Sequence, residues 1–265
     1  MRTRHTYRAR AAASWSGPPG PVRGETRHGL ARVISKRGAC SRSEAERWVL
    51  AGRISVEGRV VRDPQWPTRM EASIAVDGRQ LLRQTPIYIA FNKPRGVVTT
   101  ASDERGRATV YDALATAELP WLGVVGRLDK ASEGLLLLSN DTAWANGINA
   151  PASHRTKVYH VQVDQVASEP LIDAMKAGVR CDGERLRVVE ASLLRAGQRH
   201  CWLEVVLDEG RNRQIRRLLD ALGVNVLRLV RVAIGDVALG DLPKGQWRHL
   251  SAAEVAALRP AGPLQ

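Results

Sequence analysis

The chain has 265 residues and carries 40 Lys and Arg against 27 Asp and Glu, a net charge of +13. This excess favours an anionic partner such as RNA or DNA, and the 44% of apolar residues can form the cores of one large and one small domain. No apolar run approaches the roughly 20 residues that span a bilayer, so we expect no membrane contact.

The positive charge is concentrated near the N-terminus. Residues 1–85 carry 17 Lys and Arg against 7 Asp and Glu, whereas residues 86–265 carry 23 against 20. We therefore expect the N-terminal part to supply most of the electrostatic attraction to nucleic acid, and this attraction should weaken as salt rises because bound phosphates release their counterions.

The cysteines argue against a metal site and a disulfide framework. Cys40, Cys181 and Cys201 are odd in number, far apart and without the Cys/His spacing of metal ligands. The sequence thus predicts neither a metal nor a disulfide, which suits a protein of the reducing cytoplasm.

Residues 1–27 predict a disordered basic extension. Five arginines precede the first acid, Glu25, and the Pro- and Gly-rich segment 17–21 breaks regular structure. An organellar transit peptide, a tail that touches RNA and a misassigned start codon all remain open for this segment.

Residues 28–80 predict a small domain of two helices and a short sheet. Leu30, Val33 and Ile34 mark a helix that ends at Gly38, and Ser41 with Glu44 forms a capping box for the next. A hairpin over 54–61 and a strand over 74–76 follow.

Two patterns in this domain, 40–46 and 51–61, resemble the alpha-L RNA-binding module of the ribosomal protein S4 type. The resemblance implies a domain that grips structured RNA. Its candidate RNA contacts are Arg37, Arg42, Arg47 and Arg53, although each of them could equally lie on a solvated face.

Residues 81–86 read as a linker, after which a strand over 87–91 opens a second domain. Pro94 and Gly96 predict a turn at the end of this strand. Its two cations, Lys93 and Arg95, are candidate phosphate contacts.

Asp129 lies between two short apolar runs, 122–125 and 135–138, that predict buried strands joined by a tight connection. With Arg127 nearby, its carboxylate would stay ionised and could act as a nucleophile or a base. A surface ion pair is the alternative.

The residues around Asp129 support the first interpretation. Gly126 to Asp129, Ser132, Gly134, the four leucines and Asn140-Asp141 resemble the signature of the pseudouridine synthases of the RsuA/RluB/RluE/RluF type, which isomerise uridine in ribosomal RNA. The resemblance implies that Asp129 is catalytic and that no cofactor is used. The chain departs from it where many members carry Asp-Thr, because Ala131-Ser132 stands there.

The alternating segment 157–163 predicts a strand with Tyr159 and Lys157 on one face. A tyrosine at such a position can belong to the core. In the family the Lys-x-Tyr pattern places the ring against the target base, where stacking contributes roughly 1–3 kcal/mol, and Lys157 becomes an RNA contact.

The rest of the chain predicts mostly strands. Helices over 168–177 and 215–222 are set among strands at 186–194, 201–207, 226–232, 234–237 and 245–250. Residues 87–258 are therefore expected to form an α+β catalytic domain with a mixed, mainly antiparallel sheet rather than a doubly wound one.

The run from Glu209 to Arg217 resembles the third motif of the family, in which a basic side chain pairs with the catalytic Asp. By position this role falls to Arg216, with Arg213 as the alternative. Arg211, Arg213 and Arg217 are then candidate phosphate contacts, while a solvated helix face remains the simpler interpretation.

Together these features predict a monomeric, cytoplasmic RNA pseudouridine synthase without metal or cofactor. Its expected partner is ribosomal RNA, large-subunit rRNA first, with small-subunit rRNA or tRNA as alternatives. A non-catalytic RNA-binding factor in ribosome assembly is the competing class.

Overall fold

The computed structural model describes residues 26–101 and 103–259. The expectations about the basic extension therefore fall almost entirely outside the described residues. The chain separates into two compact units, Met1–Val33 with Ala45–Leu81 and Ile34–Glu44 with Leu82–Gln265. The division after Leu81 falls in the expected linker, whereas the grouping of Ile34–Glu44 with the larger unit differs from the expected boundaries.

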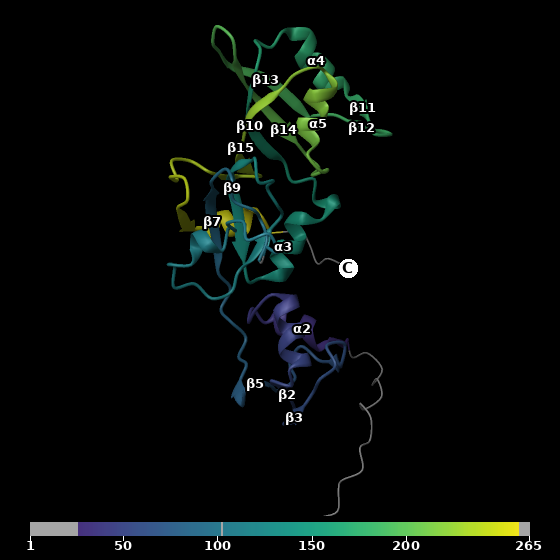
Figure 1. The fold of residues 1–265 in the computed structure, drawn as a ribbon, viewed down its shortest axis with the longest axis vertical. Helices are drawn as coiled ribbons and strands as arrows, with labels where there is room; N and C mark the ends of the chain where they lie inside the picture. Colours follow the sequence, from purple (N-terminus) through teal and green to yellow (C-terminus); the bar gives the residue numbers. More distant parts are fainter. Residues whose placement is uncertain (1–25, 102, 260–265) are drawn as a thin grey trace, which may run out of the picture. The chain divides into compact units, whose positions relative to one another are not determined.

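The N-terminal part contains the expected two helices and small sheet (Figure 1). The helices are α1 (Leu30–Lys36) and α2 (Arg42–Leu50), and Ser41 caps the second through the amide of Glu44 at 3.1 Å. A four-stranded sheet has the order β3-β2-β5-β6, and β1 pairs with β4. The strands are β1 (His28–Gly29), β2 (Ile54–Val56), β3 (Arg59–Val60), β4 (Pro67–Thr68), β5 (Ile74–Val76) and β6 (Arg79–Gln80).

The turn between β2 and β3 shows why this hairpin was predictable. Glu57 and Gly58 both have positive φ angles, 47° and 78°, as a tight two-residue hairpin turn requires. Ile54 and Ile74 on the adjacent strands are completely buried, as are Ala45 and Val49 of α2. Small as it is, the first unit thus has an apolar core.

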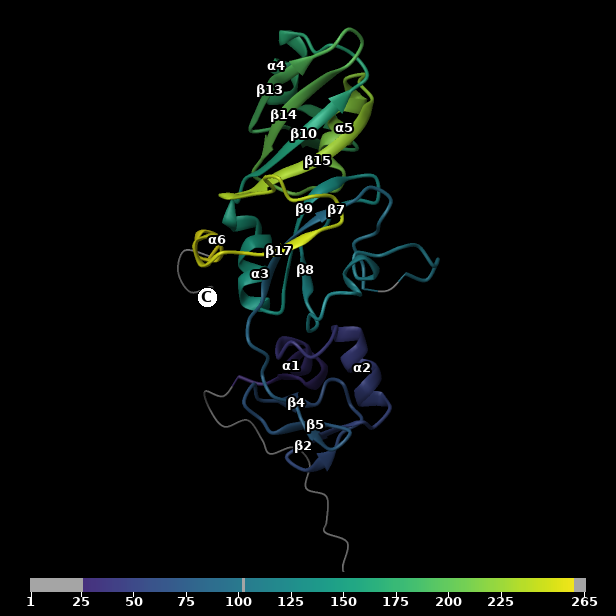
Figure 2. The same ribbon diagram turned by 90° about the vertical axis from the view of Figure 1, so that its left-hand side faces the viewer.

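The second unit is built on a nine-stranded sheet (Figure 2). Seven of its strands follow the order β13-β14-β10-β15-β9-β7-β17, and the other two, β16 and β8, pair with β15 and β9. All pairs are antiparallel except β9 with β15. The strands are β7 (Tyr88–Lys93), β8 (Gly123–Val125), β9 (Glu133–Ser139), β10 (Lys157–Val163), β13 (Glu190–Ala196), β14 (Cys201–Leu207), β15 (Val226–Ile234), β16 (Val237–Ala238) and β17 (Trp247–His249). The predicted mixed, mainly antiparallel α+β fold is confirmed.

The sheet is covered by helices and short connecting segments. The helices are α3 (Thr142–Asn149), α4 (Glu169–Ala177), α5 (Gln214–Ala221) and α6 (Ala252–Ala257), with 3₁₀ turns η1 (Asp112–Leu114) and η2 (Pro151–Ser153). Asp141 caps α3 by accepting from the amides of Ala143 and Trp144, and Ser251 with Glu254 forms a capping box on α6. In both helices a short polar side chain thus satisfies amides of the first turn.

The leucine run of β9 is buried on both faces. Leu136 and Leu138 pack in the core that contains α5, whereas Leu135 and Leu137 pack against Trp144 of α3. An antiparallel strand with one face in water would alternate apolar and polar residues, and β9 does not. The four consecutive leucines therefore mark the strand at the centre of the unit.

The segment between α4 and β13 differs from the sequence prediction. A single strand was expected over 186–194, but the structure has a separate hairpin of β11 (Val179–Cys181) and β12 (Glu184–Leu186), and β13 begins only at Glu190. Asp182 and Gly183 form its turn with positive φ angles of 49° and 82°. The Asp182-Gly183 pair, with apolar and charged residues alternating on either side of it, is a hairpin signal that the prediction of a single strand over 186–194 did not use.

Candidate active site

Asp129 lies in the loop that connects β8 to β9, at the edge of a cavity of about 780 Å³. Gly126 opens the loop with a φ angle of 74°, and Leu128 is buried beside the acid. The side chain of Asp129 is 37% exposed. The carboxylate therefore faces the cavity, while the buried side chain of Leu128 anchors the loop in the core.

Six consecutive carbonyl oxygens of this loop are hydrogen-bonded. The loop residues from Arg127 to Ser132 each accept a bond, and the donors are, in order, Arg231 Nη1, Thr99 Oγ1, the Ser132 amide, the Gly96 amide, Arg216 Nη2 and Lys93 Nζ. Three of these six donors are cationic side chains. The loop is thus held in one conformation by groups from several distant segments.

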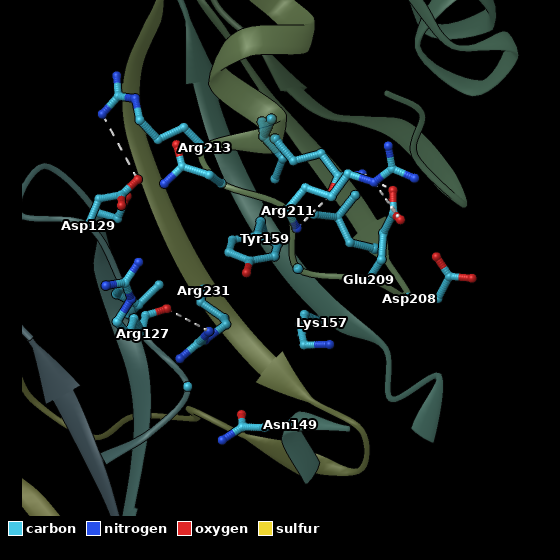
Figure 3. A pocket seen from close by; sticks show the side chains of 18 of the residues that line it. Arg127, Asp129, Asn149, Lys157, Tyr159, Asp208, Glu209, Arg211, Arg213 and Arg231 are labelled. Atoms are coloured by element: carbon cyan, nitrogen blue, oxygen red, sulfur yellow. Dashed lines mark hydrogen bonds and ion pairs between the residues drawn. The ribbon is translucent and has the colours of Figure 1, made fainter. Parts of the chain in front are cut away.

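Tyr159 and Arg213 line the same cavity from two other elements (Figure 3). Tyr159 belongs to the face of β10 that was expected to carry it, and only 9% of the residue is exposed. Arg213 precedes α5 in a left-handed conformation with a φ angle of 47°. The structure therefore brings the predicted acid and aromatic ring to one cavity.

The arginine that pairs with Asp129 is Arg213, the alternative partner. Its Nη1 lies 4.0 Å from Oδ2 of Asp129. Arg216 instead donates from Nη2 to the carbonyl of Ala131 at 3.1 Å and from Nη1 to that of Val226 at 3.2 Å. Burial and the charge of Arg213 lower the pKa of Arg216, and the charge of Asp129 opposes them. Arg216 thus supports the acid's loop and acts on Asp129 through its field.

Lys93 does not occupy the expected RNA-binding position. Its residue exposure is 0%, because β7 is an inner strand of the sheet, between β9 and β17. The ammonium group donates to the carbonyls of Ser132 at 2.8 Å and Pro94 at 3.1 Å. The proposal of a phosphate contact is therefore wrong for this lysine, which supports the Asp129 loop instead.

Burial lowers the pKa of Lys93 from 10.5 to about 8, against the opposing charges of Asp129 and Glu133. At pH values between about 8 and 10.5, the unfolded chain binds more protons than the native one, so raising the pH stabilises the native state. From about pH 7 to about pH 9.5, the free energy of unfolding of the wild type should rise by about 2 kcal/mol relative to that of Lys93→Met. Urea unfolding of both proteins at the two pH values measures it, and an unchanged difference would contradict the assignment.

Two of the expected RNA-binding arginines are engaged within the protein. Arg37 is only 8% exposed, so its side chain is not offered to a ligand. Arg217 is 21% exposed and pairs with Glu184 at 3.0 Å and Asp182 at 3.1 Å. The acids come from the β11–β12 hairpin, which the sequence did not reveal. Neither arginine fits the role of a phosphate contact.

The remaining candidates stay predictions. Arg53 is exposed but bridges Asp77 at 2.6 Å and lies over the ring of Trp48. Arg211 pairs with Glu184 and Glu209, both at 2.9 Å. The other exposed candidates are Arg42, Arg47, Arg95 and Arg127.

Lys157 lines the cavity, and its ammonium group donates to the carbonyl of Arg155 at 2.8 Å. Burial and the neighbouring charge of Arg231 lower the pKa of Lys157, although Asp208 opposes them. The position fits the expected RNA contact, which stays a prediction.

Several cavity residues were not found from the sequence. Arg231 lies on the buried face of β15, while Arg185 and Arg187 come from the β11–β12 hairpin and the residues after it. Arg231 could have been found, because its alternation with Leu229 places a cation at an inward position of a strand. The two hairpin arginines carried no such signal.

Glu133 anchors the other end of the loop. It is 2% exposed and is bound by Arg228 through two bonds of 3.1 Å and by Lys244 at 2.5 Å. Burial alone would raise the pKa of Glu133, but the bonds from Arg228 and Lys244 outweigh it and lower the pKa. The first residue of β9 is therefore fixed to β15 by an ion pair in which the acid is buried and Arg228 is partly exposed.

Within 26–101 and 103–259 no group of three or more His, Cys, Asp or Glu could hold a metal ion. No helix in the same ranges is long and apolar enough to cross a membrane. All three cysteines are buried.

The chain matches two known families over distinct segments. Residues 87–221 match the RNA pseudouridylate synthases, and residues 29–73 match the S4 domain. A pseudouridylate synthase of known crystal structure aligns with a TM-score of 0.62 and 28% identity, covering 87% of this chain and 99% of that one.

Curated relatives agree with these matches. An uncharacterized RNA pseudouridine synthase of Rickettsia conorii is 34% identical over 84% of this chain and 96% of its own length. The ribosomal large subunit pseudouridine synthase B of Bacillus subtilis is 32% identical over 87% of this chain and 95% of its own length. The chain therefore belongs to the RNA pseudouridine synthase family, with an S4 domain in its N-terminal part.

Proposed function

We propose that this synthase isomerises specific uridines of large-subunit ribosomal RNA to pseudouridine by an Asp129-dependent mechanism without a cofactor. The observation that carries the proposal is the single cavity that holds the carboxylate of Asp129 and the ring of Tyr159. The relative from Bacillus subtilis, named for the large ribosomal subunit, supports the choice of RNA.

The cavity suits an extruded nucleotide. A uridine stacked inside RNA is out of reach of a carboxylate, so it must leave the stack at a cost of a few kcal/mol. The cavity volume of about 780 Å³ lies in the range of small-molecule sites. Tyr159 would stack on the uracil, a contact that contributes roughly 1–3 kcal/mol.

Asp129 would initiate cleavage of the N-glycosidic bond, by attack on the sugar, by attack on the base or by taking a proton from the ribose. The detached uracil then turns against Tyr159 and rejoins C1′ of the same ribose through C5, after which C5 loses its proton and N1 gains one, so that the product is an isomer of uridine. Arg213, with its Nη1 4.0 Å from Oδ2 of Asp129, would offset the negative charge of the carboxylate. No hydride, phosphoryl group or oxygen is transferred, which is why a cofactor is not required.

The S4 domain and the exposed arginines near the cavity would hold the surrounding RNA. Arg42 and Arg47 on α2, and Arg95 and Arg127 near Asp129, are exposed. Such contacts position RNA through its phosphates and weaken with salt. Since the substrate is ribosomal RNA, we place the enzyme in the compartment of ribosome assembly, the cytoplasm.

Mapping pseudouridine at nucleotide resolution in cells that lack the protein tests this proposal. We expect one or more sites in large-subunit rRNA to revert to uridine and to be restored by the wild-type chain but not by Asp129→Asn. Lost sites confined to small-subunit rRNA or tRNA would correct the substrate. Restoration by Asp129→Asn, or no lost site in any RNA, would favour a non-catalytic assembly factor.

A further inference from the structure

Arg231 occupies the point where three strands meet beneath the active site. On β15 it pairs with Tyr159 of β10 on one side and with Gly134 of β9 on the other. Only 4% of the residue is exposed. A fully charged side chain at such a position needs partners, because burying an unpaired guanidinium is costly.

The guanidinium group of Arg231 is bound to backbone rather than to an acid. Nε donates to the carbonyl of Leu135 at 2.8 Å, and Nη1 lies 3.5 Å from the carbonyl of Arg127 (Figure 3). Nη2 is buried without a hydrogen-bond partner, and no carboxylate pairs with Arg231 in the part of the chain that the structure describes. The side chain thus bridges β9 and the residue two positions before Asp129.

The backbone of Arg231 is as closely engaged as its side chain. A Cβ atom on Gly134 would come within 3.0 Å of three backbone atoms of Arg231, so β9 and β15 approach each other there more closely than side chains allow. On the opposite side the register places Tyr159 directly across from Arg231. One residue therefore contacts both the strand of the ring and the loop of the acid.

We propose that Arg231 is a positioning residue that sets the separation between Asp129 and Tyr159. Its backbone is tied to the strand of Tyr159, and its guanidinium holds the carbonyl of Arg127 in the Asp129 loop. Arg216 holds the same loop at Ala131, but it comes from α5 and is not paired with β10. The inference rests on the proposed function, because it concerns the geometry between the acid and the base-stacking ring.

Loss of this bridge should affect the chemical step more than RNA binding. A displacement of about 1 Å between reacting groups can cost about 100-fold in rate. Phosphate contacts elsewhere on the RNA do not depend on Arg231, since its buried guanidinium is not offered to the phosphate backbone. We therefore expect a fall in kcat with little change in the dissociation constant of the RNA.

The test compares Arg231→Met and Arg231→Lys with Arg155→Met. Arg155 is a matched control, because it also donates to two backbone carbonyls, those of Ala257 and Arg259, but does not line the cavity. We expect kcat to fall about 100-fold in Arg231→Met, to recover in part in Arg231→Lys, and to stay near wild type in Arg155→Met. The dissociation constant of the RNA should change less than twofold in all three.

A second readout does not depend on activity. Amide hydrogen exchange over residues 126–132 should become faster in Arg231→Met and stay unchanged in Arg155→Met. If the wild type were inactive on every RNA tested, the proposed function would fail while this exchange result could still stand. Unchanged kcat and exchange in Arg231→Met, or a dissociation constant that rises in step with the loss of kcat/KM, would overturn the positioning role.

Discussion

Asp129→Asn is expected to abolish pseudouridine formation, with a loss of about 10⁴-fold or more in kcat. The amide has nearly the shape of the carboxylate but is neither a useful nucleophile nor a base, so every route that begins at this side chain is blocked. Because the side chain is 37% exposed and pairs with Arg213 only at 4.0 Å, the fold should tolerate the change. Nucleoside analysis of RNA treated with the purified variant measures the loss.

The dissociation constant for the same RNA should stay within about twofold of wild type, since most of the affinity comes from phosphate contacts. Asp220→Asn is a suitable control: this acid is exposed on α5 and does not line the cavity. Retention of more than a tenth of the wild-type rate by Asp129→Asn would exclude Asp129 as the initiating group.

Gly134→Ala should destabilise the second unit by more than about 4 kcal/mol. The glycine has a φ angle of 101°, which an L side chain rarely adopts, and its Cβ would collide with the carbonyl oxygen and the amide nitrogen of Arg231. Backbone atoms cannot turn aside as side-chain ends can, so β9 and β15 would have to separate. Urea unfolding measures the effect.

Gly223→Ala isolates the contribution of the collision. Gly223 also has a positive φ angle, 73°, but a Cβ there meets nothing within 4 Å. Its replacement should cost only about 1 kcal/mol, the usual penalty for a left-handed L residue. Insoluble Gly134→Ala beside soluble Gly223→Ala would agree with the expectation, whereas equal unfolding midpoints would show that the two strands can move apart at little cost.

Much of this fold was predictable because the signals were local. The cap of α2 by Ser41 and the alternation of 157–163 each fixed an element through a short-range rule. Resemblance to a family predicted one site for Asp129 and Tyr159, and both residues line one cavity in the structure.

The partner of Asp129 was harder to predict. A helical wheel drawn from Gln214 puts Arg216 on the polar side, but it gives no direction for Arg213, which precedes the helix in a left-handed conformation. That conformation aims Arg213 at Asp129 and leaves Arg216 to bind carbonyls. Side chains next to a conformational break cannot be placed by periodicity.

Lys93 shows a second limit of the sequence. A cation beside a Pro-Arg-Gly turn normally lies in water, since turns lie on the surface. Here the strand before the turn lies inside the sheet, and the lysine donates to the carbonyl of Ser132, 39 positions further along the chain, as well as to that of the adjacent Pro94. Only the sheet order reveals this, and sheet order depends on pairings between distant segments.

Because the carbonyls of residues 127–132 are all hydrogen-bonded within the protein, the Asp129 loop is ordered before RNA binds. A disordered catalytic segment would have to be frozen whenever substrate arrives, at about 1–2 kcal/mol for each residue. In this enzyme the loop loses that conformational entropy when the protein folds, not when RNA binds. If the exposed arginines bind phosphates as we propose, their attraction is then available to pull the target nucleotide out of its helix, and selectivity among uridines would depend on how readily each one unstacks.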